Sequence, residues 1–175
     1  MNTADKCVES YNRLKNLKLV ANEVGVSWQM VYIHLKKKGV AVVGDKLKYG
    51  SETDKLAARG EALFQKLVPF AEDQNKIKFQ SKIDFKIGNL NIDVKTSTAK
   101  NNRYSFSLKK QELLADFFVL FGYLNDEPRH AFLIPHEVMK NYQTISLSFS
   151  AKGKWWDYEI DMNDINSFFK EVAAA

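Results

Sequence analysis

Residues 82–97, KIDFKIGNLNIDVKTS, alternate apolar and polar side chains on both sides of a Gly-Asn pair. The apolar members of this pattern are Ile83, Phe85, Ile87, Leu90, Ile92 and Val94. Alternation with period two around a two-residue turn predicts a β-hairpin. Since the turn length decides which residues face each other, Ile87 is expected opposite Leu90. Three residues further from the turn, Asp84 is then expected opposite Asp93.

Two carboxylates facing each other need an explanation, because like charges at roughly 5 Å across a ladder repel each other and destabilise it. The arrangement becomes favourable when a divalent cation lies between Asp84 and Asp93, and Mg²⁺ prefers oxygen ligands of this kind. Lys95 projects from the same face as Asp93, where it can polarise a water or stabilise charge on a phosphate. Val94 points into the core, and its backbone carbonyl is a further candidate ligand. The hairpin therefore predicts a site for phosphodiester hydrolysis.

The remaining patterns indicate helices that cover a sheet. Residues from Glu52 to Pro69 carry an apolar face at helical spacing. The later segments are expected, in order, as a strand near Ile77, the hairpin, a polar loop at 98–105, an apolar helix at 108–123, strands at 130–135, 144–150 and 154–160, and a helix at 163–172. This order predicts an α/β fold in which helices cover a central mixed sheet.

The first third of the chain carries all of the excess positive charge. Residues 1–50 contain nine Lys and Arg against four Asp and Glu, whereas residues 51–175 contain seventeen of each. A locally basic segment suits a polyanionic partner, most often nucleic acid. Residues 40–54 are expected as a short strand pair or wing that runs into a polar linker. We therefore expect a DNA-binding domain at 1–50 and a second domain at 51–175.

Residues 17–39 predict two helices joined by a short turn at Gly25. Ser27 is placed to cap the second helix, and Val31 and Leu35 form its inner face. This plan resembles a helix-turn-helix. The resemblance implies that the second helix enters the major groove of double-stranded DNA. The residues it would present there are Ser27, Trp28, Gln29, Tyr32, Ile33 and Lys36. The alternative is an amphipathic helical pair that forms an interaction domain, with Trp28 in its core.

Composition excludes several classes of protein. The single cysteine, Cys7, allows no internal disulfide and fits a reducing cytosol. Three scattered histidines beside it exclude a zinc-finger type of site. No run of about 18 apolar residues is present to span a membrane, and the first ten residues lack the apolar core of a signal peptide. We therefore expect a cytoplasmic protein.

The hairpin resembles the signature of the PD-(D/E)xK nucleases, because Asp84 is followed by a short turn and then by Asp93-Val94-Lys95. Within this class the resemblance is to the small enzymes associated with group I introns. Gly60-Glu61 upstream is similar to the first helix of that fold, and ADFFVLFGY followed by HAFLIPHEV is similar to its later helix and strand. The resemblance covers about residues 54–140. Ile83 stands where the family has its proline, and Asp93 where glutamate or glutamine is commoner.

The resemblance implies a restriction-endonuclease-like core and a DNA endonuclease that depends on Mg²⁺ or Mn²⁺. Asp84, Asp93 and the Val94 carbonyl would hold the metal, Lys95 would activate water, and Glu61 would supply a further acid. Glu52 and Glu72 remain alternatives to Glu61. Asp84-Phe85-Lys86 is a competing D-x-K register, but it has no acid closely upstream. Lys110 and Gln111 are candidate phosphate contacts.

Cutting both strands requires two such centres, so we expect a homodimer or a larger symmetric oligomer. Two other functions remain open. One is a catalytically inert DNA-binding regulator on a nuclease scaffold. The other is a resolvase that prefers four-way (Holliday) junctions to linear duplex.

Overall fold

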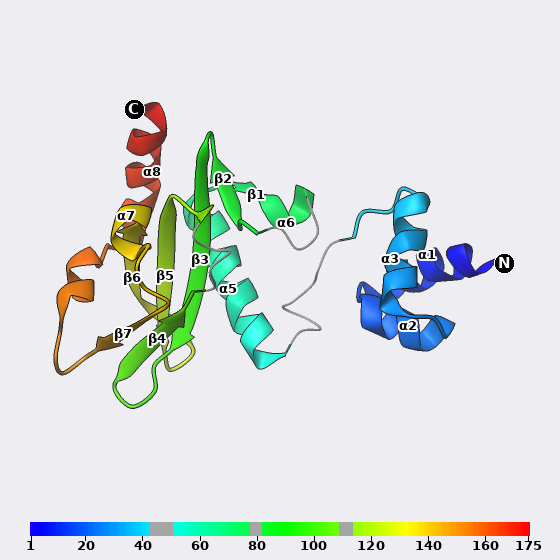
Figure 1. The fold of residues 1–175 in the computed structure, drawn as a ribbon, viewed down its shortest axis with the longest axis horizontal. Coiled ribbons are helices and arrows are strands. Elements are labelled where there is room, and N and C mark those ends of the chain that lie inside the picture. Colours follow the sequence, from blue (N-terminus) through cyan, green and yellow to red (C-terminus); the bar gives the residue numbers. More distant parts are fainter. Residues whose placement is uncertain (43–50, 78–81, 109–113) are drawn as a thin grey trace. The chain divides into compact units, whose positions relative to one another are not determined.

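The computed structural model describes residues 1–42, 51–77, 82–108 and 114–175. The chain divides into two compact units, Met1–Ser51 and Glu52–Ala175 (Figure 1). Most of the expected wing at 40–54 lies outside the described residues, as do Lys110 and Gln111. In the part of the chain that is described, no helix is long and apolar enough to cross a membrane.

The first unit is built from three helices that pack on one another. They are α1 (Thr3–Leu14), α2 (Leu17–Val24) and α3 (Trp28–Lys37). Side-chain oxygens of Asn2, Asn16 and Ser27 cap their N-termini by accepting backbone N–H groups. The helices bury a common core of Cys7, Tyr11, Val20, Val31 and Leu35. Both helices predicted at 17–39 are therefore confirmed, with Gly25 ending α2.

The second unit contains a mixed five-stranded sheet, which confirms the predicted packing of helices on a mixed sheet. Its strands are β1 (Glu72–Asp73), β2 (Phe85–Ile87), β3 (Leu90–Thr98), β5 (Phe117–Leu124) and β6 (Glu127–Pro135), in the order β1-β2-β3-β5-β6. β3 and β5 are parallel, and the other neighbours are antiparallel. A separate two-stranded sheet pairs β4 (Arg103–Ser107) with β7 (Thr144–Ser148).

Both faces of the main sheet are covered (Figure 1). On the first face, α5 (Glu52–Leu67) and α8 (Ile165–Ala174) pack over Ile92, Val94 and Phe121. A Cβ on Gly60 would lie 2.1 Å from Thr96 Cγ2, so glycine is required for this close approach of α5 to β3. On the second face, the β4–β7 sheet, α7 (His136–Met139) and the 3₁₀ helix η2 (Lys154–Tyr158) cover Phe118 and Leu120. A short helix α6 (Gln74–Ile77) and a 3₁₀ turn η3 (Met162–Asp164) complete the described elements.

The expected apolar helix at 108–123 is wrong. Residues Phe117–Leu124 form β5, a central strand, and residues 109–113 lie outside the described part. Six consecutive residues of β5, from Phe118 to Tyr123, are buried. A strand buried on both faces has no polar alternation, so its sequence resembles that of a buried helix.

Three smaller expectations also fail. The predicted polar loop at 98–105 includes the start of β4, whose partner β7 is remote in sequence and gives no local signal. Ile77 ends helix α6 and is not in a strand, while the rest of that segment, 78–81, is outside the described residues. The predicted strand at 154–160 contains η2. Trp155 and Trp156 both pack in one cluster, whereas neighbouring residues of a strand point to opposite faces.

Candidate active site

The β2–β3 hairpin has the predicted register. Ile87 pairs with Leu90 and Phe85 with Ile92, which leaves Gly88 and Asn89 as the two-residue turn. Gly88 has a φ of +58°, a conformation that favours glycine at the first turn position. The paired residues of the hairpin end at Phe85 and Ile92, so Asp84 lies one residue beyond β2 and Asp93 lies one residue beyond the last position of β3 that pairs with β2. The turn chemistry in the sequence therefore brings both aspartates to the end of the hairpin ladder.

Asp84 lies just before β2, where its side chain is half-buried. Its Oδ2 accepts the backbone N–H of Val94 at 2.8 Å. The Val94 side chain is buried in the core beneath α5. In a strand, the N–H and C=O of one residue point to the same side, so the Val94 carbonyl points to the side on which Asp84 lies. This bond anchors the Asp84 carboxylate at the end of the ladder.

Asp93 and Lys95 form an ion pair on the second face of β3. Asp93 is only 3 % exposed, and its Oδ2 lies 3.3 Å from Lys95 Nζ. The Lys95 side chain remains 22 % exposed, so one end of the pair reaches solvent. Burying a carboxylate is costly unless it is paired. Each aspartate thus has a favourable partner within the protein, and these two interactions offset the repulsion expected between the carboxylates.

Glu61 and the two aspartates belong to different layers. Glu61 follows Gly60 on α5, which packs on the first face of the sheet, whereas Asp93 lies on the second face. Of the alternatives, Glu52 lies at the start of α5 and pairs with Lys55 at 3.6 Å. Among the described residues, no three His, Cys, Asp or Glu side chains form a group that could hold a metal ion. The contacts of the described residues place the Asp84 carboxylate on the N–H of Val94, between Asp93 and Lys95, and a role for Glu61 stays a prediction.

Glu72 is the alternative acid that shares the face of the aspartates. It lies on β1 opposite Lys86, and Lys86 in turn lies opposite Asn91 on β3. Directly opposed residues project from the same face of a sheet. Alternation along β3 then places Glu72 on the same face as Asp93.

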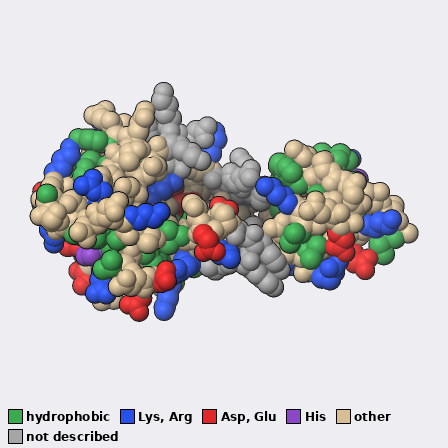
Figure 2. Space-filling model, turned by 90° about the horizontal axis from the view of Figure 1, so that it is seen from below, with side chains coloured by type: hydrophobic (Ala, Val, Ile, Leu, Met, Phe, Trp, Pro, Cys, Tyr) green, Lys and Arg blue, Asp and Glu red, His purple; other side chains and the backbone are tan. Residues whose placement is uncertain are grey.

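The candidate groove-reading residues lie on the exposed side of α3. Trp28 is 37 % and Ile33 is 42 % exposed, so Trp28 is not a core residue. Gln29 and Lys36 are also exposed, and the Lys36 ammonium lies 5.7 Å from the Tyr32 ring centroid. The Ser27 hydroxyl accepts the Met30 N–H at 3.2 Å, which gives it a structural role as the cap. Figure 2 shows Lys and Arg side chains beside apolar ones on this unit.

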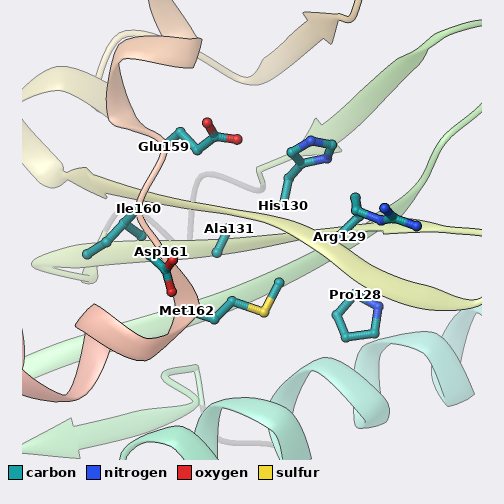
Figure 3. A pocket seen from close by; sticks show the side chains of 8 residues that line it. All are labelled: Pro128, Arg129, His130, Ala131, Glu159, Ile160, Asp161 and Met162. Carbon is teal, nitrogen blue, oxygen red and sulfur yellow. The ribbon is translucent and has the colours of Figure 1, made fainter.

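A separate cavity that the sequence did not indicate lies between β6 and the chain that follows η2. Its volume is about 480 Å³, and Arg129, His130, Glu159 and Asp161 contribute its charged or titratable lining (Figure 3). The Tyr104 hydroxyl lies 2.7 Å from His130 Nδ1. Burial raises the pKa of Tyr104 to about 12 and lowers the pKa of His130 below its ordinary value. At neutral pH this partly buried Tyr104–His130 pair is therefore uncharged.

A comparison with protein-family models found no match, and a comparison with curated proteins found no similar sequence. The geometry of the hairpin therefore carries the functional argument.

Proposed function

We propose that the Glu52–Ala175 unit is a metal-dependent DNA endonuclease of the PD-(D/E)xK type. One observation carries the proposal: the Asp84 carboxylate accepts the N–H of Val94, the residue between Asp93 and Lys95, while Lys95 Nζ lies 3.3 Å from Asp93 Oδ2. A buried acid paired with a half-buried lysine is costly as a purely structural device, and such pairs are frequent where chemistry occurs. The close packing of α5 on β3 at Gly60 and the parallel pair β3–β5 also fit this fold.

The donor set fits a hard cation. The Asp84 carboxylate bonds to the N–H that follows Asp93 in the chain, and carboxylate oxygens are ligands that suit Mg²⁺ or Mn²⁺. Asp84 and Asp93 would hold the ion together with the Val94 carbonyl. When bound, the ion supplies Lewis-acid charge at the scissile phosphate.

The protein residues would divide the remaining tasks between them. Asp84 is held in place by the Val94 N–H, so its carboxylate needs little reorganisation. Asp93 is the buried member of its pair with Lys95, and the Lys95 side chain is the member that reaches solvent. Its ammonium would orient the attacking water and stabilise negative charge that develops on the phosphate. Cutting both strands would use two copies of this site in a symmetric oligomer.

The test is nicking of a supercoiled plasmid by the full chain. Activity should require Mg²⁺ or Mn²⁺ and vanish in excess EDTA, because carboxylates alone supply no electrophile. Lys95→Ala should lower the cleavage rate by about 10²–10³-fold while DNA affinity stays nearly unchanged. Lys170→Ala, an exposed lysine on α8, is the matched control. Full turnover in EDTA, or an equal loss of binding and cutting in Lys95→Ala, would contradict the proposal.

The first unit would position the enzyme as a helix-turn-helix. Support comes from the three-residue connection between α2 and α3 and from the exposed residues Trp28, Gln29, Ile33 and Lys36. Ile33→Glu should weaken duplex binding without lowering the melting temperature, because Ile33 is outside the core. Fluorescence anisotropy on labelled duplex measures this. Unchanged affinity and unchanged site preference would assign α3 to a protein partner instead.

An inert DNA-binding regulator is the rival function. It is favoured by the finding that no group of three metal-binding side chains occurs among the described residues. Mg²⁺-dependent nicking decides between the two. A preference for four-way junctions over linear duplex in the same assay would instead identify a resolvase.

A further inference from the structure

The small β4–β7 sheet has an outward face made almost entirely of hydroxyl side chains. Its inward residues, Tyr104, Phe106, Ile145 and Leu147, are buried in the core of the second face. Pairing sets Ser105 opposite Ser146 and Ser107 opposite Thr144. The outward positions are Arg103, Ser105, Ser107, Thr144, Ser146 and Ser148. None of them is acidic, and none is a large apolar residue of the kind that anchors protein partners.

Cations gather at one end of this hydroxyl face. Lys100 and Arg103 exchange backbone hydrogen bonds of 3.0 and 3.1 Å across the turn between β3 and β4. The Arg103 guanidinium donates to Ser146 Oγ at 3.3 Å, so it lies along the face. Lys152 Nζ lies 4.5 Å from the Trp156 ring, and the indole N–H of Trp156 donates to the Ser148 carbonyl at 2.8 Å. Lys152 is therefore at the same end, because Ser148 pairs with Arg103.

The face is joined to the candidate active site through Ser97. Its Oγ accepts the backbone N–H of Ser105 at 3.1 Å, which ties β4 to β3. Lys95 precedes Ser97 by two residues on the same face of β3, roughly 7 Å along the strand. Since the turn after β3 reverses the chain, β4 runs back toward the end of β3 that carries Asp93.

We propose that this hydroxyl face, with Lys100, Arg103 and Lys152 at its end, holds the sugar–phosphate backbone of DNA and leads it to Asp93 and Lys95. This inference rests on the proposed nuclease function and names the surface that would present the substrate. Phosphate oxygens are contacted by arginine, lysine and short hydroxyl side chains. Serine, a short side chain, also lets the sugar–phosphate backbone of DNA approach the sheet more closely than longer side chains do. In Figure 2, Lys and Arg side chains are spread over this unit among uncharged polar, hydrophobic and acidic side chains.

The test compares charge-matched variants of the full chain. Arg103→Glu and Lys170→Glu change the net charge equally, but Lys170 is exposed on α8, on the opposite side of the sheet. Ser105→Glu on the hydroxyl face and Ser167→Glu on α8 form a second pair, in which each variant adds one negative charge. Duplex affinity is measured in EDTA against salt concentration, and plasmid cleavage is measured in Mg²⁺. Melting temperatures confirm folding, and Arg103→Gln replaces the glutamate variant if that one does not fold.

Arg103→Glu should lower the slope of log affinity against log salt by about one unit, the value for one lost phosphate contact. Ser105→Glu should weaken binding and slow cleavage several-fold, and both α8 variants should match the wild type. If the wild type cuts DNA and all four variants behave alike, the hydroxyl face is not the substrate surface, while the nuclease function stands. If the wild type neither binds nor cuts DNA, both proposals fall together.

Discussion

Two partly buried polar pairs lie on the same face of the main sheet, and they differ in charge. Asp93 and Lys95 form an ion pair on β3, and Tyr104 and His130 form a hydrogen-bonded pair between β4 and β6. Burial raises the pKa of Tyr104 to about 12 and lowers the pKa of His130, so the second pair stays neutral. This domain therefore satisfies polar groups away from solvent in two ways, once with an ion pair and once with a neutral hydrogen bond.

A functional role is needed to explain the charged pair but not the neutral pair. A neutral hydrogen-bonded pair satisfies its own polar groups and stabilises the packing of the β4–β7 sheet on β6. A buried ion pair is often no better for stability than apolar residues of the same size. The proposed nuclease chemistry, which needs a carboxylate and an ammonium together, would explain why such a pair lies beside Asp84.

Asp93→Asn should have the largest effect on stability and should also eliminate cleavage. The substitution removes the carboxylate that pairs with Lys95, whose side chain is only 22 % exposed. We expect the metal-free free energy of unfolding to fall by about 1.5–3 kcal/mol, the range for hydrogen bonds to charged groups. Urea denaturation in EDTA measures it. If the variant is more stable than the wild type, repulsion between Asp84 and Asp93 outweighs the ion pair.

The matched control for this variant is Asp84→Asn. An asparagine oxygen can still accept the Val94 N–H, so this variant should keep nearly all of its stability while losing cleavage. Mg²⁺ should stabilise the wild type by mass action and both variants much less.

Tyr104→Phe should have a smaller effect, confined to stability. It removes the hydroxyl that bonds His130 and changes no charge. We expect a loss of about 0.5–1.5 kcal/mol, the range for a neutral hydrogen bond, with plasmid cleavage unchanged. Denaturation and nicking assays on the same preparation test both parts. A fall in cleavage with normal folding would mean that the two pairs are coupled.

The pH dependence of stability should show the smallest effect. Desolvation lowers the pKa of His130 below its ordinary value of 6.5, while Glu159 opposes the shift and Lys152 and Arg129 reinforce it. The unfolded chain therefore binds a proton more readily than the folded one, so His130 contributes stability above pH 6.5 that is lost as the pH falls below it.

His130→Phe provides the comparison for this contribution. It leaves the Tyr104 hydroxyl without its partner, which shifts the whole stability curve by a constant. The fall in stability between pH 7.5 and pH 5 should be shallower in the variant, as thermal melts across that range would show. An equal or steeper fall would mean that His130 is not buried as a neutral group.

Local patterns determined those parts of the structure whose interactions are short in range. The Gly88-Asn89 turn and the alternation around it were enough to set the β2–β3 register from Ile87 and Leu90 to Phe85 and Ile92. Helical spacing and the Ser27 cap likewise predicted α2 and α3. In each case the residues that decide the conformation are neighbours in the sequence.

Features that depend on partners remote in the sequence follow from the tertiary fold alone. β5 is a strand because it is inserted between β3 and β6 and buried on both faces, a context that its apolar sequence does not reveal. The hydroxyl face exists because β4 pairs with β7 some forty residues later in the chain. This pairing is non-local, and the sequence of neither strand specifies its partner. The partners of Asp84 and Asp93 are close to them in sequence. How much each interaction contributes to stability depends on how deeply the aspartate is buried, and the layers on the two faces of the sheet determine that burial.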